Sequence, residues 1–160
     1  MSERFLEGRV AMVTGGASGM GRAMALAFAK AGADVSIGSL LSNRKETKAD
    51  GELVNMPGSE EMDRTKKEIE AFGVRALALE LDVTSTESCE NFYEETVKAF
   101  GKVDILANAA GITAEHGVVD HPEELWLKVM DVNANGPFRM SKLCLPGMMQ
   151  RKWGRIITIS

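Results

Sequence analysis

The chain has 160 residues, a formal net charge of −4 and a hydrophobic fraction of 44%, which suit one domain or a large part of one. It has no basic tract, which argues against nucleic acid as the main partner, and its apolar runs are too short to span a bilayer. The N-terminal sequence MSERFLEGRV lacks the apolar region of a secretory signal. Cys89 and Cys144 form no CxxC pair, so we expect two reduced thiols in a cytoplasmic protein rather than a disulfide framework or a zinc site.

Apolar runs typical of strands alternate with helical patterns along the chain. The strand-like runs occupy 9–14, 34–37, 75–81, 103–107 and 155–160. Apolar residues recur at helical spacing over 21–31, 60–72, 86–100 and 122–151. Strands separated by helices of this length predict right-handed βαβ units. We therefore expect an α/β fold with a doubly wound, Rossmann-like parallel sheet in which five strands are present.

Several residues predict where the helices begin and end. Gly32 is a plausible stop for the first helix, and Ser85 or Thr86 can cap the helix over 86–100. Pro122 is allowed in a first helical turn. The segment 133–137 can bend or interrupt the last helix before it continues to residue 151.

The segment over 39–61 reads SLLSNRKETKADGELVNMPGSEE and is long and polar for a connection between a strand and a helix. It contains Gly51, Pro57 and Gly58, which favour turns. We interpret it as an insertion in a single domain over 1–160, and it is either a functional loop or a mobile one.

Three glycines, Gly15, Gly19 and Gly21, lie between the first strand and the first helix. A helix N-terminus binds phosphate well, because free backbone N–H groups and the helix dipole face the anion. Glycine at such a joint permits the turn, the approach of a pyrophosphate and close helix packing. The pattern predicts a dinucleotide site, and the alternative is an ordinary glycine-rich turn. A nucleoside-triphosphate loop is disfavoured because no Gly-Lys-Ser/Thr sequence follows.

With Thr14 in front, the spacing is Thr-Gly-x-x-x-Gly-x-Gly, and other motifs follow in order: LDV over 81–83, ANAAG over 107–111, VNANGPF over 132–138 and GRIITIS over 154–160. In these motifs the chain resembles the short-chain dehydrogenase/reductase family. The resemblance covers nearly the whole chain apart from 39–61. It implies an oxidoreductase that transfers a hydride between NAD or NADP and an alcohol or carbonyl substrate, the nicotinamide cofactor carrying the hydride. The alternative is a dinucleotide-binding module without catalysis.

The resemblance also implies roles for matched positions. It places the cofactor against Thr14, Gly15, Ser18, Gly19, Met20, Gly21, Ser39, Asp82, Val83, Asn108, Ala109 and Gly111. It makes Asn133 the active-site asparagine, which supports a proton relay. Simpler roles are also open: Asp82 can cap a turn before Thr84, Asn108 can satisfy a buried backbone group, and Asn133 can be a helix-break residue.

The end of the second strand is where NAD and NADP are distinguished, because a carboxylate there binds the ribose diol and repels a 2′-phosphate. The pattern places the non-acidic Ser39 at this position, with Arg44 and Lys45 just beyond it, which favours NADP slightly. Ser18 points the other way, since phosphate-preferring relatives often carry a basic residue there. Arg44, Lys45 and Lys48 can equally belong to a solvated loop.

The resemblance further implies a catalytic serine and a tyrosine followed four residues later by lysine. Tyr93 is the only tyrosine and Val97 occupies the fourth position after it, so we expect Tyr93 to be an ordinary position of an amphipathic helix. The serine, the tyrosine and two more strands would follow Ser160. We therefore expect an incomplete domain, inactive by itself, with Ile156, Ile157 and Ile159 on an exposed strand edge.

The expected partners are a nicotinamide dinucleotide and a small alcohol or carbonyl compound. We expect no metal, because His116 and His121 have no nearby ligands in the sequence. The resemblance implies a homodimer or homotetramer, and Met140, Met148 and Met149 lie on the long helix that such enzymes often use for subunit contacts.

Overall fold

Five parallel strands form the central sheet of the computed structural model, which describes residues 4–42, 50–54 and 56–160. Their order across the sheet is β4 (Ala76–Glu80), β2 (Asp34–Ser39), β1 (Val10–Thr14), β5 (Ile105–Asn108) and β7 (Arg155–Thr158). All four neighbouring pairs are parallel. The doubly wound α/β fold predicted from the sequence is thereby confirmed.

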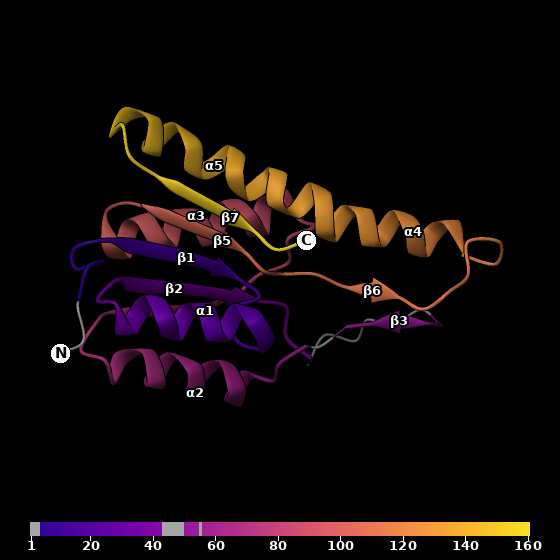
Figure 1. The fold of residues 1–160 in the computed structure, drawn as a ribbon, viewed down its shortest axis with the longest axis horizontal. Helices are drawn as coiled ribbons and strands as arrows, with labels where there is room; N and C mark the ends of the chain where they lie inside the picture. The colour runs from indigo at the N-terminus through magenta and orange to yellow at the C-terminus, as the bar shows by residue number, and fades with distance from the viewer. Residues whose placement is uncertain (1–3, 43–49, 55) are drawn as a thin grey trace.

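Helices cover both faces of this sheet. Figure 1 shows α1 (Gly19–Lys30) and α2 (Ser59–Glu70) on one side, and α3 (Thr86–Phe100) and α5 (Gly136–Gln150) on the other. Two predicted boundaries are confirmed: Gly32 follows α1 with φ +98°, and Ser85 accepts a hydrogen bond from the Ser88 amide at the start of α3. Within the described residues, no helix is both long and apolar enough to cross a membrane.

The strand β1 is buried over its whole length and separates two apolar cores. Ala11 and Val13 pack in the core beneath α1 and α2, whereas Met12 packs with Phe92 and Met140 beneath α3 and α5. Successive side chains of a strand point to opposite faces. A strand between two layers of helices therefore needs an apolar residue at nearly every position, as the run VAMV has.

The polar segment predicted as a loop over 39–61 contains regular structure at its C-terminal end. A short strand, β3 (Glu52–Leu53), pairs in antiparallel fashion with β6 (Thr113–Ala114), and α2 already begins at Ser59. Two residues are too few to show a strand period in a sequence, so this pairing could not be predicted locally. Arg44, Lys45 and Lys48 lie outside the described residues.

The expected break at 133–137 is a widened helical turn instead. The π-helical segment η1 (Asp131–Asn135) connects α4 (Glu123–Met130) directly to α5. A π-turn carries one extra residue within a continuous helix, so the chain passes Pro137 without leaving the helical path. The two helices form one long rod along the molecule (Figure 1).

Side chains at the end of the chain fall partly inside and partly outside the core. All three methionines lie on α5, as expected; Met140 and Met148 are buried in the core, whereas Met149 is 72% exposed. The strand β7 forms one edge of the sheet, and Ile156, Ile157 and Ile159 are each 37–38% exposed, as predicted.

Candidate functional site

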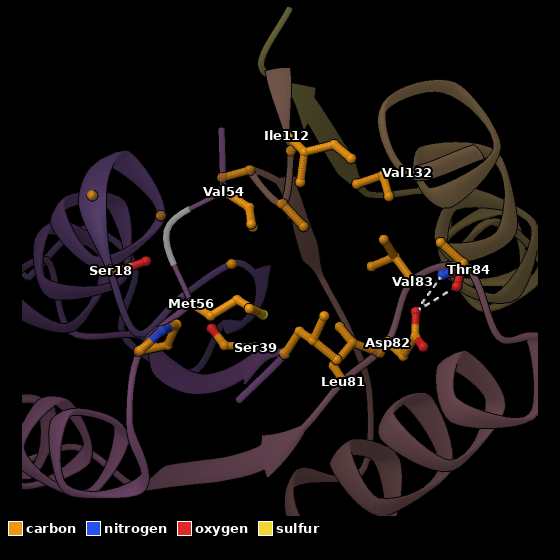
Figure 2. Close-up of a pocket in the computed structure, with 18 of the residues that line it drawn as sticks. Ser18, Ser39, Val54, Met56, Leu81, Asp82, Val83, Thr84, Ile112 and Val132 are labelled. Atoms are coloured by element: carbon orange, nitrogen blue, oxygen red, sulfur yellow. Dashed lines mark hydrogen bonds between the residues drawn. The ribbon is translucent and has the colours of Figure 1, made fainter. Parts of the chain in front are cut away.

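A cavity of about 360 Å³ opens at the carboxyl ends of β1, β2, β4 and β5. Ten of the twelve residues predicted to bind a cofactor line it: Gly15, Ser18, Gly19, Met20, Gly21, Ser39, Asp82, Val83, Ala109 and Gly111. Figure 2 shows side chains from these separate loops facing a shared space. Parallel strands bring their C-terminal loops to one edge of the sheet, which is where ligands bind in open α/β folds.

The glycine loop holds the first turn of α1 against this cavity. A Cβ on Gly21 would collide with the carbonyl group of Gly15, so the helix packs onto the loop only with glycine at 21. At Gly19, φ is +51° and an added Cβ would meet nothing within 4 Å. The position therefore borders open space beside the first amides of the helix, which have no intrahelical partners. This geometry suits an anion.

Thr14 and Asn108 lie beneath the cavity rather than in its lining. The Thr14 hydroxyl accepts hydrogen bonds from the amides of Ala109 and Ala110, at 3.2 and 3.1 Å, and so joins the end of β1 to the end of β5. The Asn108 amide group donates to the Thr158 hydroxyl at 3.4 Å. Among the described residues, Asn108 Oδ1 is the buried side-chain oxygen or nitrogen that has no hydrogen-bond partner. Both residues shape the floor of the site.

Asp82 both lines the cavity and closes a turn. Its Oδ1 accepts hydrogen bonds from the Thr84 amide at 2.9 Å and the Thr84 hydroxyl at 2.6 Å (Figure 2). The turn-capping role considered for this aspartate is therefore present in the structure. The carbonyl of the next residue, Val83, accepts a hydrogen bond from Arg139 at 3.0 Å, which fixes the loop against α5.

Ser39 ends β2 at the cavity and is almost fully buried. Its hydroxyl accepts a hydrogen bond from the Ala17 amide at 3.1 Å. The second strand is thereby tied to the glycine loop, and the hydroxyl proton remains available as a donor. No carboxylate occupies this position.

Asn133 does not line the cavity but fixes one of its walls. Its side-chain amide exchanges two hydrogen bonds with the backbone of Ile112, which follows Gly111 in the lining. Nearby, the Asp131 carboxylate accepts hydrogen bonds from Asn135 and Arg139. These contacts, that of Asn135 foremost, lower the pKa of Asp131, and partial burial opposes them. The π-turn thus places the side chain of Asn133 against Ile112 and that of Asp131 against Arg139.

Sequence reasoning missed several residues of the lining, because no chemical role was assigned to them or because they lie outside the recognised motifs. Ile112 and Val132 stand within or beside the recognised motifs, but Glu52, Val54 and Met56 come from the polar segment and Lys128 from α4. The Lys128 ammonium lies 2.9 Å from the Glu52 carboxylate. Only the folded chain brings these residues together.

Tyr93 lies on α3 and packs against the core beneath α3 and α5, as expected for an amphipathic helix. It does not line the cavity, and burial raises its pKa. Burial likewise raises the pKa of Cys89 to about 11 and that of Cys144 to about 12. Because the thiolate is the nucleophile, neither cysteine is activated at neutral pH. Within the described part of the chain, no group of three metal-binding side chains could hold a metal ion.

Comparison with known proteins identifies the family. The family model described as short chain dehydrogenase matches residues 9–160. The chain belongs to the short-chain dehydrogenase family. It is 37% identical to a short chain dehydrogenase of Pseudocercospora fijiensis, over 99% of this chain and 47% of that protein. An NAD-dependent glycerol dehydrogenase of Listeria innocua is 34% identical, over 95% of this chain and 52% of that protein.

Further short-chain dehydrogenases agree with this assignment. The chain is 32% identical to the 3-oxoacyl-[acyl-carrier-protein] reductase FabG of Thermotoga maritima, over 97% of this chain and 56% of that protein. A solved structure from Sinorhizobium meliloti 1021, assigned to the short-chain alcohol dehydrogenases, matches with a TM-score of 0.81 and 29% identity. That match covers 98% of this chain and 55% of the solved one. The chain spans about half the length of these three curated relatives.

Proposed function

We propose that this chain is the cofactor-binding part of an NAD(P)-dependent oxidoreductase that acts on an alcohol or carbonyl compound. The observation that carries the proposal is one shared cavity, bounded by the glycine loop at the start of α1 and by the Asp82–Val83 turn after β4. Its volume of about 360 Å³ lies within the range of small-molecule sites. Family membership supports the reaction class.

The residues of the cavity fit a nicotinamide dinucleotide. The first amides of α1, at Gly19, Met20 and Gly21, would hold the pyrophosphate. The Asp82 carboxylate and the Val83 backbone would contact the adenine end. The Gly111 backbone would border the ribose, and Asn108 would shape the sheet edge beneath it. When bound, the nicotinamide ring supplies or accepts the hydride.

The protein itself would position the ligand and transfer a proton. Asn133 acts through Ile112, because its two hydrogen bonds hold the wall that carries Gly111. Tyr93 does not line the cavity, so we assign it no part in the reaction. The serine, tyrosine and lysine that would orient the substrate and move the proton are proposed to lie beyond residues 1–160. The isolated segment is therefore proposed to bind the dinucleotide without turnover.

For the choice of dinucleotide we retain a slight preference for NADP. It rests on Ser39, where no carboxylate would repel a 2′-phosphate. Ser39→Asp is expected to weaken NADPH binding about tenfold or more and to leave NADH binding comparatively intact. Equal loss of both dinucleotides in the variant, or tighter binding of NADH than NADPH by the unchanged protein, would contradict this preference.

Assembly into a homo-oligomer in the cytoplasm is also proposed. Four large apolar side chains of α4 and α5 are more than half exposed: Trp126, Leu127, Phe138 and Met149. Association of two copies of the chain would bury large exposed apolar side chains of this kind. Light scattering on the full-length protein should give a multiple of the monomer mass, and Phe138→Glu should reduce it.

The decisive test is a titration of the full-length protein with NADH and NADPH, followed by turnover with a panel of alcohols and carbonyl compounds. Binding together with turnover is the expected result. Binding without turnover on any compound would indicate the non-catalytic module. Absence of binding for both dinucleotides would overturn the proposal.

A further inference from the structure

Part of the polar segment between β2 and α2 forms one wall of the cavity. Residues 50–54, 56 and 57, here named the strap, contain β3 and thus its pairing with β6, in which Glu52 stands opposite Ala114. The Glu115 amide donates to the Gly51 carbonyl at 2.9 Å, and the Ser42 amide donates to the Pro57 carbonyl at 3.0 Å. The strap is therefore attached at both ends.

Polar contacts fix the start of the strap to the region after β5. The Lys128 ammonium lies 2.9 Å from the Glu52 carboxylate, whose side chain is only 4% exposed. The His116 ring nitrogen Nε2 lies 2.9 Å from the Asp50 carbonyl oxygen. A carboxylate this deeply buried needs a cationic partner, because it has lost most of its hydration. The ion pair with Lys128 therefore helps to hold Glu52, and with it β3, in place.

Beyond this anchor the strap turns apolar and enters the cavity lining. Val54 and Met56 both line it, together with Leu81 after β4, Ile112 after β5 and Val132 in η1. Figure 2 shows Val54 on the side of Ile112 and Met56 beside Ser39. The glycine loop contributes mainly backbone on its side of the cavity. Met20 is the large apolar side chain that this side contributes, and the strap adds two more.

We infer that Val54 and Met56 are further dinucleotide-binding residues, and that the Glu52–Lys128 ion pair positions them; this rests on the proposed function of the same cavity. A ligand lying on the glycine loop is covered by these two side chains, which remove apolar surface of the ligand from water. For the ligand to leave, its contacts with Val54 and Met56 must break. Loss of these contacts should therefore act mainly on the rate of dissociation, which is where most differences in affinity arise.

The test compares dissociation rates of NADH and NADPH from the full-length protein, measured by stopped-flow displacement with excess oxidised dinucleotide. The double variant V54A/M56A removes the proposed contacts. The matched control, V118A/V119A, truncates two side chains that are each 96% exposed and do not line the cavity. We expect V54A/M56A to dissociate about tenfold faster or more, with little change in the association rate, and the control to match the unchanged protein.

The ion pair is tested separately with K128M and with the double variant E52Q/K128M. K128M leaves a buried carboxylate without this partner and should accelerate dissociation. E52Q/K128M removes both charges and should dissociate more slowly than K128M, because no buried carboxylate is left without its cationic partner. The control is K142M, which removes an exposed lysine of α5.

Hydrogen exchange on the unchanged protein gives a readout that needs no variant. The Glu115 amide, which donates to the strap, should exchange more slowly when dinucleotide is bound. Unchanged protection there, or equal dissociation rates for V54A/M56A and the unchanged protein, would overturn the inference while leaving the dinucleotide site intact. If the unchanged protein binds no dinucleotide, the proposed function fails and the inference with it.

Discussion

The side-chain amide of Asn133 accepts a hydrogen bond from the Ile112 amide at 2.9 Å and donates one to the Ile112 carbonyl at 2.8 Å. The two residues are 21 positions apart, one in the π-turn and one after β5. This reciprocal pair satisfies both the backbone N–H and the backbone carbonyl of Ile112. It fixes the loop that carries Gly111 to the cavity.

Asn133→Ala should therefore affect activity more than stability. Asn133 is exposed, so water replaces its hydrogen bonds and the free energy of unfolding should fall by only about 1 kcal/mol. A shift of the Gly111 wall should lower turnover of the full-length enzyme by about a hundredfold. Urea unfolding and steady-state kinetics measure the two effects. Asn135→Ala, which removes a contact to Asp131 only, should leave turnover nearly unchanged; equal turnover in both variants would contradict the role of Asn133.

Alanine substitutions at three glycines should separate packing from binding. Gly21→Ala places a Cβ 2.7 Å from the Gly15 carbonyl carbon, so we expect a loss of about 3 kcal/mol in stability. Gly19→Ala meets no atom but stands at φ +51°, so it should cost about 1 kcal/mol and weaken dinucleotide binding strongly. Gly117→Ala has open space and no positive φ and is the control. Thermal unfolding and dinucleotide titration give the ranking, and a Gly21 variant as stable as the control would refute the packing argument.

Asp104 should contribute strongly to stability at the amino-terminal end of β5, which is the end away from the cavity. Its side chain is 1% exposed, accepts a hydrogen bond from the Val10 amide at 3.0 Å and lies 2.9 Å from the Lys102 ammonium. Asp104→Ala should lower the free energy of unfolding by about 1.5 to 3 kcal/mol, the range for hydrogen bonds to a charged group. Asp63→Ala, at an exposed position of α2, should change it by less than about 0.5 kcal/mol. Urea unfolding would contradict this if the two variants were alike.

The stabilising effect of Asp131 should depend on pH. Its pKa in the folded chain is lowered from 3.8, chiefly by the hydrogen bond from Asn135, with Arg139 also contributing. A lowered pKa means that the folded state favours the carboxylate, so the contribution is complete well above pH 3.8 and is lost as the pH falls through the folded value. Asp131→Asn should therefore be less stable than the unchanged protein at neutral pH and nearly equal to it in strong acid. Asp120→Asn removes an equal charge as the control, and a gap that persists in acid would contradict this.

Local signals in the sequence were sufficient for the framework of the fold and for ten of the residues that line the cavity. The run at Val10–Thr14 predicted a buried strand because every position is apolar or, at Thr14, small. Ser85 marked the start of α3, where its side chain accepts a hydrogen bond from Ser88, and Gly32 marked the end of α1, where it adopts a positive φ. Conversely, the segment 133–137 contains a proline, which suggested a break in the helix. The π-turn that lets the helix continue past Pro137 leaves no recognisable signal in the sequence.

The sequence by itself determined the alternation of strands and helices and the glycine loop, because these depend on neighbouring residues and on backbone freedom at Gly15 and Gly21. The tertiary structure alone decided that Thr14 supports the Ala109 and Ala110 amides, 95 and 96 positions away. It also decided that Glu52 meets Lys128 across 76 positions and brings the strap to the cavity. Such contacts depend on which loops the parallel sheet gathers at one edge. That arrangement is a property of the whole packed chain, and no short stretch of sequence contains it.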